Sequence, residues 1–256
     1  MQRNVSQRWL AYESSEIDWC EDNYRVNPYV AEFVNTISNI LLVIFPVFLI
    51  RSNIWRSYLQ HVSVGPQISL YMISVAGLGS VYFHGTLSLM GQFLDEIAQL
   101  WGFTIVYAFF FPARFLPKII PRAIFILIGA ALTLMWFIDP NIYRFWSFSI
   151  CIPTWIVISR EYSNGKNSHV LWYFVFGFRL FCICTIFWLV DILFCDDVKS
   201  LGFPGSHFFF HICVAWISYI AFTLFAFFRA DGDAPHIKAT LKTAFLVIPY
   251  VHCEKE

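Results

Sequence analysis

The chain has 256 residues, of which 58% are hydrophobic, 20% aromatic and only 13% charged, and its mean hydropathy is +0.61. A soluble domain carries about 25% charged residues, so this chain cannot cover a globular surface with polar groups, and lipid must form much of its surroundings. The formal net charge is zero, which provides no general basic surface, and we expect no nucleic-acid partner.

Residues 1–29, called the hook below, are polar and acidic, and no cleavable signal peptide is evident in them. The stretch "DWCEDN" at 18–23 crowds Asp18, Glu21, Asp22 and Asn23 into six positions. Carboxylate and amide oxygens are the ligands of hard cations such as calcium, and Glu32 could complete such a shell. The hook lacks the full EF-hand pattern, so a solvated acidic segment is the other interpretation that the spacing allows.

Seven apolar segments follow, at about 30–50, 68–90, 93–112, 123–138, 142–159, 169–194 and 206–228. Several approach the ~20 residues that span a bilayer, while the fourth and fifth are shorter. Backbone polar groups in lipid must be satisfied internally, and the runs lack the alternation of a membrane barrel, so we predict helices. The predicted fold class is all-α: one polytopic membrane domain over 1–256, with the hook, a seven-helix bundle over 30–228 and a tail over 229–256.

The charges of the predicted loops indicate an orientation. The loops after the first, third and fifth segments carry Arg51, Arg56, Arg114, Lys118, Arg122, Arg160 and Lys166, whereas the even-numbered loops carry only Arg144 and Lys199. Basic residues gather on the cytosolic side of membrane proteins. We therefore expect a lumenal hook and a cytosolic tail.

Polar residues gather at the lumenal ends of the second and third segments, in "GSVYFHGTLSLMGQFLDE" at 79–96. Ser80 and His84 are four residues apart and thus share a helical face. Asp95 follows just inside the third segment, after a turn around Gly91. A hydrogen-bonded structural carboxylate is the alternative for Asp95, and a small packing residue is the alternative for Ser80. Glu96 points elsewhere and has no assigned role.

The seventh segment begins with "GSHFFFHICVAW" at 205–216, in which His207 and His211 again share one helical face. Polar side chains at membrane depth are costly and face a protein interior or a water-filled cavity. The spacing fits either a hydrogen-bonded pair or a metal site. The topology places this pair near His84 and Asp95, whereas His61, His169, His236 and His252 fall in predicted loops or tails.

Three neutral imidazoles match a catalytic zinc site with water in the open fourth position. Zinc would lower the pKa of that water toward ~7 and so supply a nucleophile. Asp95 could accept a proton from the water, and Ser80 could donate a hydrogen bond to a developing oxyanion. The predicted site is therefore a zinc hydrolase centre with His84, His207 and His211 as ligands.

The motifs, taken together, resemble the alkaline ceramidases. The matching stretches are "SSEIDWCEDNY" (14–24), "AEFVNTISN" (31–39), "GSVYFHGTLSLMGQFLDE" (79–96), "WLVDILFC" (188–195), "FPGSHFFFH" (203–211) and "VIPYV" (247–251). The resemblance implies a seven-helix membrane enzyme, related to the adiponectin receptors, that hydrolyses the ceramide amide to a sphingoid base and a fatty acid. By motif, His84, His207 and His211 correspond to zinc ligands, and Ser80 and Asp95 to catalytic helpers.

The resemblance also implies a calcium site in the hook. Its ligands would be the side chains of Asp18, Glu21, Asn23 and Glu32 and the carbonyl of Trp19, and we expect the cation to brace the hook rather than perform chemistry.

Cys20 and Cys195 both fall on the lumenal side, where a disulfide can persist. The resemblance implies that they are paired. Such a bond would tie the hook to the loop that precedes His207.

Two stretches depart from the family pattern. Val190 and Ile192 flank Asp191, where the family has a serine and an arginine, so the role of Asp191 is open. Gly205 and Ser206 are smaller than the usual pair before His207, which bears on substrate preference.

Three other functions compete with the hydrolase. A lipid-sensing receptor related to the adiponectin receptors fits seven helices, but it needs no three-histidine shell with a free position. An intramembrane serine protease favours a small residue after its nucleophile, whereas Val81 follows Ser80. A transporter would show paired repeats, which the segments lack. We expect a ceramide substrate and an endoplasmic reticulum or Golgi membrane, with the active site near the lumenal face; Asn4, in "NVS", is a candidate glycosylation site.

Overall fold

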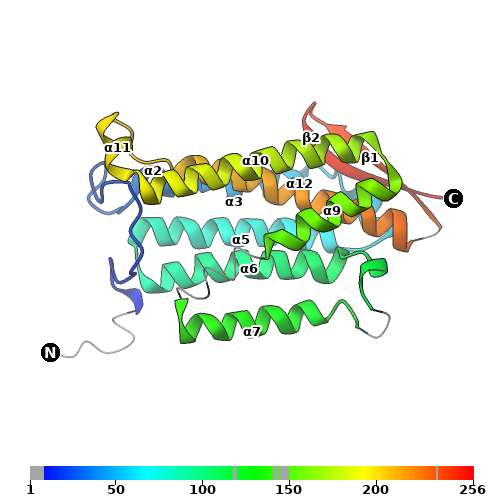
Figure 1. Ribbon diagram of the computed structural model, residues 1–256, viewed down its shortest axis with the longest axis horizontal. Coiled ribbons are helices and arrows are strands. Elements are labelled where there is room, and N and C mark those ends of the chain that lie inside the picture. The colour runs from blue at the N-terminus through cyan, green and yellow to red at the C-terminus, as the bar shows by residue number, and fades with distance from the viewer. Residues whose placement is uncertain (1–8, 118–119, 141–142, 144–149, 235) are drawn as a thin grey trace. The chain divides into compact units, whose positions relative to one another are not determined.

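The computed structural model describes residues 9–117, 120–140, 143, 150–234 and 236–256, and helices make up most of them (Figure 1). In chain order the elements are α2 (Phe33–Ser38), α3 (Ile40–Arg51), α4 (Arg56–His61), α5 (Gly65–Thr86), α6 (Leu89–Phe110), the short 3₁₀ helix η1 (Ala113–Phe115), α7 (Ile124–Ile138), α9 (Cys151–Gly165), α10 (Ser168–Leu193), α11 (Cys195–Ser200), α12 (His207–Asp233), β1 (Ile237–Ala244) and β2 (Ile248–Lys255).

Five stretches of the described chain are long and apolar enough to cross a membrane. They are Phe33–Arg51, Gly65–Thr86, Leu89–Phe110, Ser168–Leu193 and His207–Asp233. They match the first, second, third, sixth and seventh predicted segments. The fourth segment forms the shorter apolar helix α7, and the start of the fifth lies outside the described residues, with α9 covering its second half. The membrane character of the chain is thereby confirmed.

The surfaces of these helices carry large apolar side chains, as membrane helices must. Ile44 on α3, Leu127 and Leu134 on α7 and Ile186 on α10 are all more than half exposed. In water such apolar surfaces would favour aggregation, whereas in a bilayer they contact lipid chains that are equally apolar.

The tail corrects the prediction of an all-α fold. Beyond α12, the chain forms an antiparallel hairpin in which Ile237 pairs with Lys255 and Ala244 pairs with Ile248. Residues 237–242 read Ile-Lys-Ala-Thr-Leu-Lys, which is the apolar–polar alternation of a half-buried strand. The strand could therefore be recognised from its own sequence, but the prediction followed the hydropathy of the apolar segments and treated these residues as a tail.

The contacts divide the chain into two compact units. The first consists of Met1–Pro46, Ile73–Gln99 and Arg179–Ile217, and the second of Val47–Met72, Leu100–Phe178 and Ser218–Glu256. Every residue proposed above for the zinc, calcium, disulfide and catalytic roles belongs to the first unit.

In the first unit, two glycines allow the backbones of α5 and α6 to approach closely. A Cβ on Gly79 would lie 2.9 Å from the backbone of Leu94, and a Cβ on Gly91 would lie 2.7 Å from the Cα of Phe83. Any larger residue would push the two helices apart. This contact sets the register that places Ser80 opposite Asp95.

In the second unit, ion pairs secure the segment between α6 and α7. Arg114 pairs with Glu161 on α9, and Arg122 pairs with Asp233 at the end of α12. Arg229 also contacts Asp233, at 2.7 Å. The basic residues that indicated a cytosolic loop are thus partly neutralised by acidic partners.

Candidate functional site

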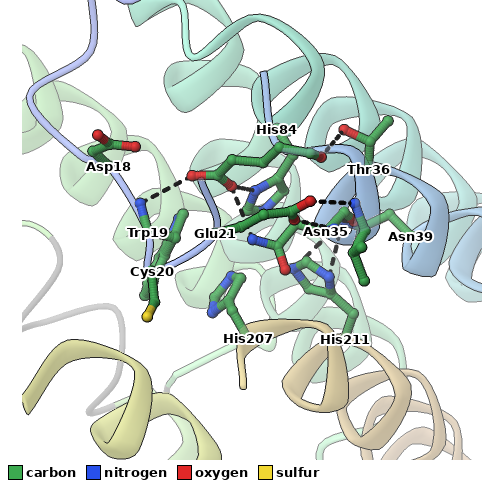
Figure 2. Close-up of polar contacts among 12 residues, drawn as sticks. Asp18, Trp19, Cys20, Glu21, Asn35, Thr36, Asn39, His84, His207 and His211 are labelled. Carbon is green, nitrogen blue, oxygen red and sulfur yellow. Dashed lines mark hydrogen bonds and ion pairs between the residues drawn. The ribbon is translucent and has the colours of Figure 1, made fainter. Parts of the chain in front are cut away.

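Three buried imidazoles meet in the first unit. His84 lies in the last turn of α5, while His207 begins α12 and His211 follows one turn later. Their ligand atoms all lie within 4.8 Å of one another, and the exposed fraction of each residue is 3% or less. Figure 2 shows the rings converging from the two helices. The structure therefore brings together the three predicted zinc ligands.

His84 is oriented by a buried carboxylate. Its Nδ1 lies 2.5 Å from Oε2 of Glu32, the residue that immediately precedes α2. The same Oε2 accepts a hydrogen bond from the side chain of Asn35, and Oε1 accepts one from the backbone N–H of Trp19. Among the described residues Nε2 of His84 has no partner. An imidazole held through Nδ1 by a carboxylate, with Nε2 left free, is the arrangement that metal-binding histidines use.

His211 has polar partners on the first membrane segment. Its Nδ1 lies 2.8 Å from the hydroxyl of Ser38 and 3.1 Å from the side-chain nitrogen of Asn39. The side-chain nitrogen of Asn39 also donates to the carbonyl of Asn35 at 2.9 Å, and the Oδ1 atom of Asn39 has no partner in the described part of the chain. The same Asn39 nitrogen also lies 3.4 Å from Nε2 of His211.

His207 is held by its neighbours' rings. The ring of Trp19 stacks on the imidazole, with 3.6 Å between centroids and 17° between planes, and Phe210 lies 5.1 Å away. Its Nδ1 is buried and has no hydrogen-bond partner among the described residues. Buried polar atoms normally have a partner in folded proteins, and a metal ion would serve as the partner of this nitrogen. The site therefore fits a metal bound by three imidazoles.

Asp191 holds the start of α12 and explains why His207 lies where it does. Its Oδ1 accepts hydrogen bonds from the backbone N–H groups of Ser206 (2.6 Å) and His207 (3.0 Å), and its Oδ2 accepts one from Cys20 (3.0 Å). A carboxylate at a helix N-terminus meets free N–H groups and the positive end of the dipole. Asp191 thus uses backbone donors, where the family pattern has a neighbouring arginine.

The disulfide between Cys20 and Cys195 is present in the structure, with 5.3 Å between the two Cα atoms. Cys195 begins α11, which follows α10 and precedes His207 in the chain. The bond and the Asp191 carboxylate therefore fasten the hook to the same region from which α12 begins.

Ser80 and Asp95 form a pair between α5 and α6. The Ser80 side chain interacts with the Asp95 carboxylate, and Nε2 of Gln99 donates a hydrogen bond to Asp95 Oδ1 at 2.9 Å. Both residues of the pair are buried. Ser80 precedes His84 by one helical turn and faces the same side. None of the contacts described for Asp95 reaches an imidazole.

Several of the predicted calcium ligands form hydrogen bonds with other protein groups. Glu21 accepts the backbone N–H groups of Val34 (2.7 Å) and Asn35 (2.8 Å), and so supplies the cap that α2 lacks locally. The side chain of Asn23 donates to Asp18 at 3.1 Å, while its Oδ1 has no partner among the described residues. In the described chain, three metal-ligand groups gather only at the histidines.

The carboxylates of Asp18, Glu21 and Glu32, which are predicted calcium ligands, are at least partly buried, and Glu32 repels the other two. Burial raises the pKa of Glu32 to about 7, because it penalises the charged form. Burial also raises the pKa values of Asp18 and Glu21, and the charge of Glu32 adds to both increases. A cation beside these groups would relieve the repulsion, and the free Oδ1 of Asn23 would offer it a further oxygen.

Several supporting residues were missed by the sequence reasoning. Asn35, Asn39, Ser38 and Gln99 had no assigned role, and Trp19 was considered only for its carbonyl. Glu32, Asn35 and Asn39 recur at helical spacing in an otherwise apolar segment, which is a polar face that the sequence already displayed. No sequence pattern predicted the contact of Gln99 with Asp95 or that of the Trp19 ring with His207.

The fold and the site define a class of protein: a multi-pass membrane protein with a buried three-histidine group that could hold a metal ion. Comparison with known proteins gives the family. Residues 11–252 match the family model Ceramidase, so the chain belongs to the ceramidase family.

Curated relatives agree with that assignment. The chain is 32% identical over 235 residues to a Drosophila melanogaster protein named alkaline ceramidase, covering 90% of this chain and 82% of the relative. It is 31% identical over 252 residues to the Caenorhabditis elegans alkaline ceramidase, with 94% and 90% covered. It is 31% identical over 214 residues to human alkaline ceramidase 1, with 80% of each covered.

Proposed function

We propose that this chain is a membrane-embedded ceramidase that hydrolyses the amide bond of ceramides to a sphingoid base and a free fatty acid. The observation that carries the proposal is the buried group of three imidazoles, with free nitrogen atoms on His84 and His207, in a member of the ceramidase family. The relatives from Drosophila melanogaster and human are named alkaline ceramidases, which supports this proposal.

His84, His207 and His211 are the residues that hold zinc in this proposal. Neutral imidazoles suit zinc, and the outer partners Glu32 and Ser38 set their orientation. When bound, zinc supplies a Lewis acid and a water molecule of lowered pKa.

The protein's own groups handle the proton and the developing charge. Asp95 accepts the proton that the attacking water releases, and Gln99 holds its carboxylate in place. The Ser80 hydroxyl, which interacts with Asp95, donates a hydrogen bond to the amide oxygen as charge develops there. The C–N bond then breaks, and the proton passes to the leaving amine.

The proposed membrane arrangement has seven spans, with α7 and α9 completing the five long helices, a lumenal hook and a cytosolic C-terminal end. The two alkyl chains of ceramide lie in the apolar part of the bundle, and the amide reaches the histidines. The membrane is that of the endoplasmic reticulum or Golgi, and the active site lies near its lumenal side.

Calcium in the hook is the structural part of the proposal. Asp18, Glu21, Asn23, Glu32 and the Trp19 carbonyl surround it. Support comes from the free Oδ1 of Asn23 and from the raised pKa values of the carboxyl groups. Glu32 joins this group to His84.

The test uses purified full-length protein in lipid nanodiscs. Bound metals are measured by elemental analysis, and ceramide turnover is followed before chelation, after chelation and after addition of zinc. We expect about one zinc per chain, loss of turnover on chelation and recovery with zinc. Stoichiometric zinc without turnover of any ceramide would instead favour the lipid-sensing receptor.

A further inference from the structure

The tip of the C-terminal hairpin is apolar and exposed. Phe245, Leu246 and Val247 connect β1 to β2, and their exposed fractions are 59%, 95% and 56%. No charged residue occurs from 243 to 251. A hairpin tip in water normally carries small polar turn residues, so this composition requires another explanation.

The backbone of the tip makes the choice of residues more unusual. The N–H of Val247 donates to the carbonyl of Ala244, closing a tight turn whose central residues Phe245 and Leu246 have φ values of +48° and +70°. Asn and Gly are strongly preferred at both positions of such turns, because a bulky side chain is strained there. The chain accepts this strain and keeps two large apolar side chains at the tip, which points to a role for them.

The tip lies against a membrane-spanning segment within the second unit. The ring of Phe245 is 5.3 Å from the ring of Phe48 on α3. Phe48 is three residues from Arg51, at the end of the span, and so lies about 4.5 Å inside that end. Phe48 is itself 46% exposed, so the apolar surface of the tip continues onto the lipid-facing surface of α3.

Hydrogen bonds fasten the hairpin to helices at two points along β2. The backbone N–H of Cys253 donates to the Ser57 hydroxyl on α4 at 3.2 Å, and the Tyr219 hydroxyl donates to the carbonyl of Pro249 at 2.6 Å. The exposed Lys242 lies three residues before Phe245, or roughly 10 Å back along the strand. At that distance its ammonium group would reach the headgroups while the tip reaches the acyl chains.

We propose that residues 245–247 insert into the bilayer beside the end of α3, so that lipid acyl chains cover them. The hairpin is then a membrane anchor for the C-terminal end of the chain rather than a free cytosolic tail. This role does not depend on the ceramidase chemistry.

The first test uses the unmodified chain in phosphatidylcholine nanodiscs and hydroxyl-radical oxidation read by mass spectrometry. Leu201, which is 75% exposed at the end of the charged helix α11, is the internal control because it is the same residue type. We expect Leu246 to be oxidised at least about tenfold more slowly than Leu201. Equal oxidation rates would overturn the proposal.

The second test identifies what covers the tip. Leu246→Cys and the control Lys238→Cys, at the base of the same hairpin, are labelled with a bimane probe in a background whose five free cysteines are replaced. We expect lipid carrying a nitroxide near its headgroup to quench the probe at 246, and aqueous iodide to quench the one at 238. If nitroxide lipid fails to quench the probe at 246, the proposal is overturned, and protection of Leu246 then means a second copy or another protein.

Discussion

The histidine group and the acidic hook are both candidate metal sites, but their side chains differ in the protein contacts that they already make. At the histidines, Nδ1 of His84 and Nδ1 of His211 meet Glu32 and Ser38, while Nε2 of His84 and Nδ1 of His207 have no partner among the described residues. In the hook, Glu21 already serves as the cap of α2. The first group could hold a metal ion with its unpartnered nitrogen atoms, whereas the second already has a structural task.

The difference teaches that ligand chemistry alone does not define a metal site. Carboxylates accept backbone N–H groups as readily as they bind cations, so an acidic cluster can be used by the fold itself. Buried neutral imidazoles with free lone pairs have fewer such alternatives. Glu32 belongs to both groups, and substitutions elsewhere are needed to separate them.

The largest expected effect is loss of a histidine. His207→Ala removes one of three ligands and leaves a gap beside the Trp19 ring, so bound zinc and turnover should fall by more than the roughly 10–100-fold that loss of an outer partner costs. His169→Ala, at the exposed start of α10, is the matched control and should retain both. Near-normal zinc content in His207→Ala would remove that residue from the ligand set.

The next effect concerns the proton acceptor. Asp95→Asn keeps the shape and the Gln99 contact but removes the base, and turnover should fall about 10²–10⁴-fold with zinc content unchanged. Glu96→Gln changes the adjacent charge and should leave turnover close to that of the parent. If Asp95→Asn turns over ceramide normally, this carboxylate has a structural role only.

Glu32→Gln sharpens the comparison by weakening the link between the two groups. The amide keeps the packing but loses the charge opposite Nδ1 of His84, so zinc affinity should fall about 10–100-fold. Competition with a chromogenic chelator measures this change. An unaltered affinity would mean that the carboxylate does not support His84 as a ligand.

Asp191→Asn tests the support of α12. The amide can accept fewer of the three backbone N–H groups, and unfolding should become easier by about 1–3 kcal/mol. Thermal unfolding in nanodiscs gives the loss, and Asp196→Asn on exposed α11 is the control. A loss no larger than that of the control would contradict the capping role.

The smallest effect on chemistry is expected from Asp18→Ala in the hook. The thermal stabilisation produced by added calcium should disappear, which is about 2.7 kcal/mol at a hundredfold excess over Kd, while zinc content stays at the parent level. Arg25→Ala, at an exposed position of the hook, should keep the calcium response. Were zinc to fall with Asp18→Ala as it does with His207→Ala, the hook and the histidines would form one site.

Local patterns determined much of this protein from sequence alone. Hydropathy predicted the five long helices, because burial in lipid demands runs of apolar residues of a fixed length. Helical spacing placed Ser80 with His84 and His207 with His211, because residues four apart share a face. The order of the helices along the chain brings these faces together in the first unit, which is why the three histidines could be predicted together.

Only the tertiary structure decided what surrounds them. Glu32 meets His84 across 52 residues, and Asp191 meets Cys20 across 171, through contacts that no periodicity encodes. Asp191 has Ile192 beside it instead of the arginine of the family pattern. It still has a structural role, because the folded chain places the backbone N–H group of Ser206, just before α12, within hydrogen-bond distance of its carboxylate. The hairpin turn likewise carries Phe245 and Leu246 against local preference, since their partner, Phe48 on α3, lies almost 200 residues away in the chain. Sequence spacing specifies which face a side chain is on, whereas packing of distant segments specifies what that face meets.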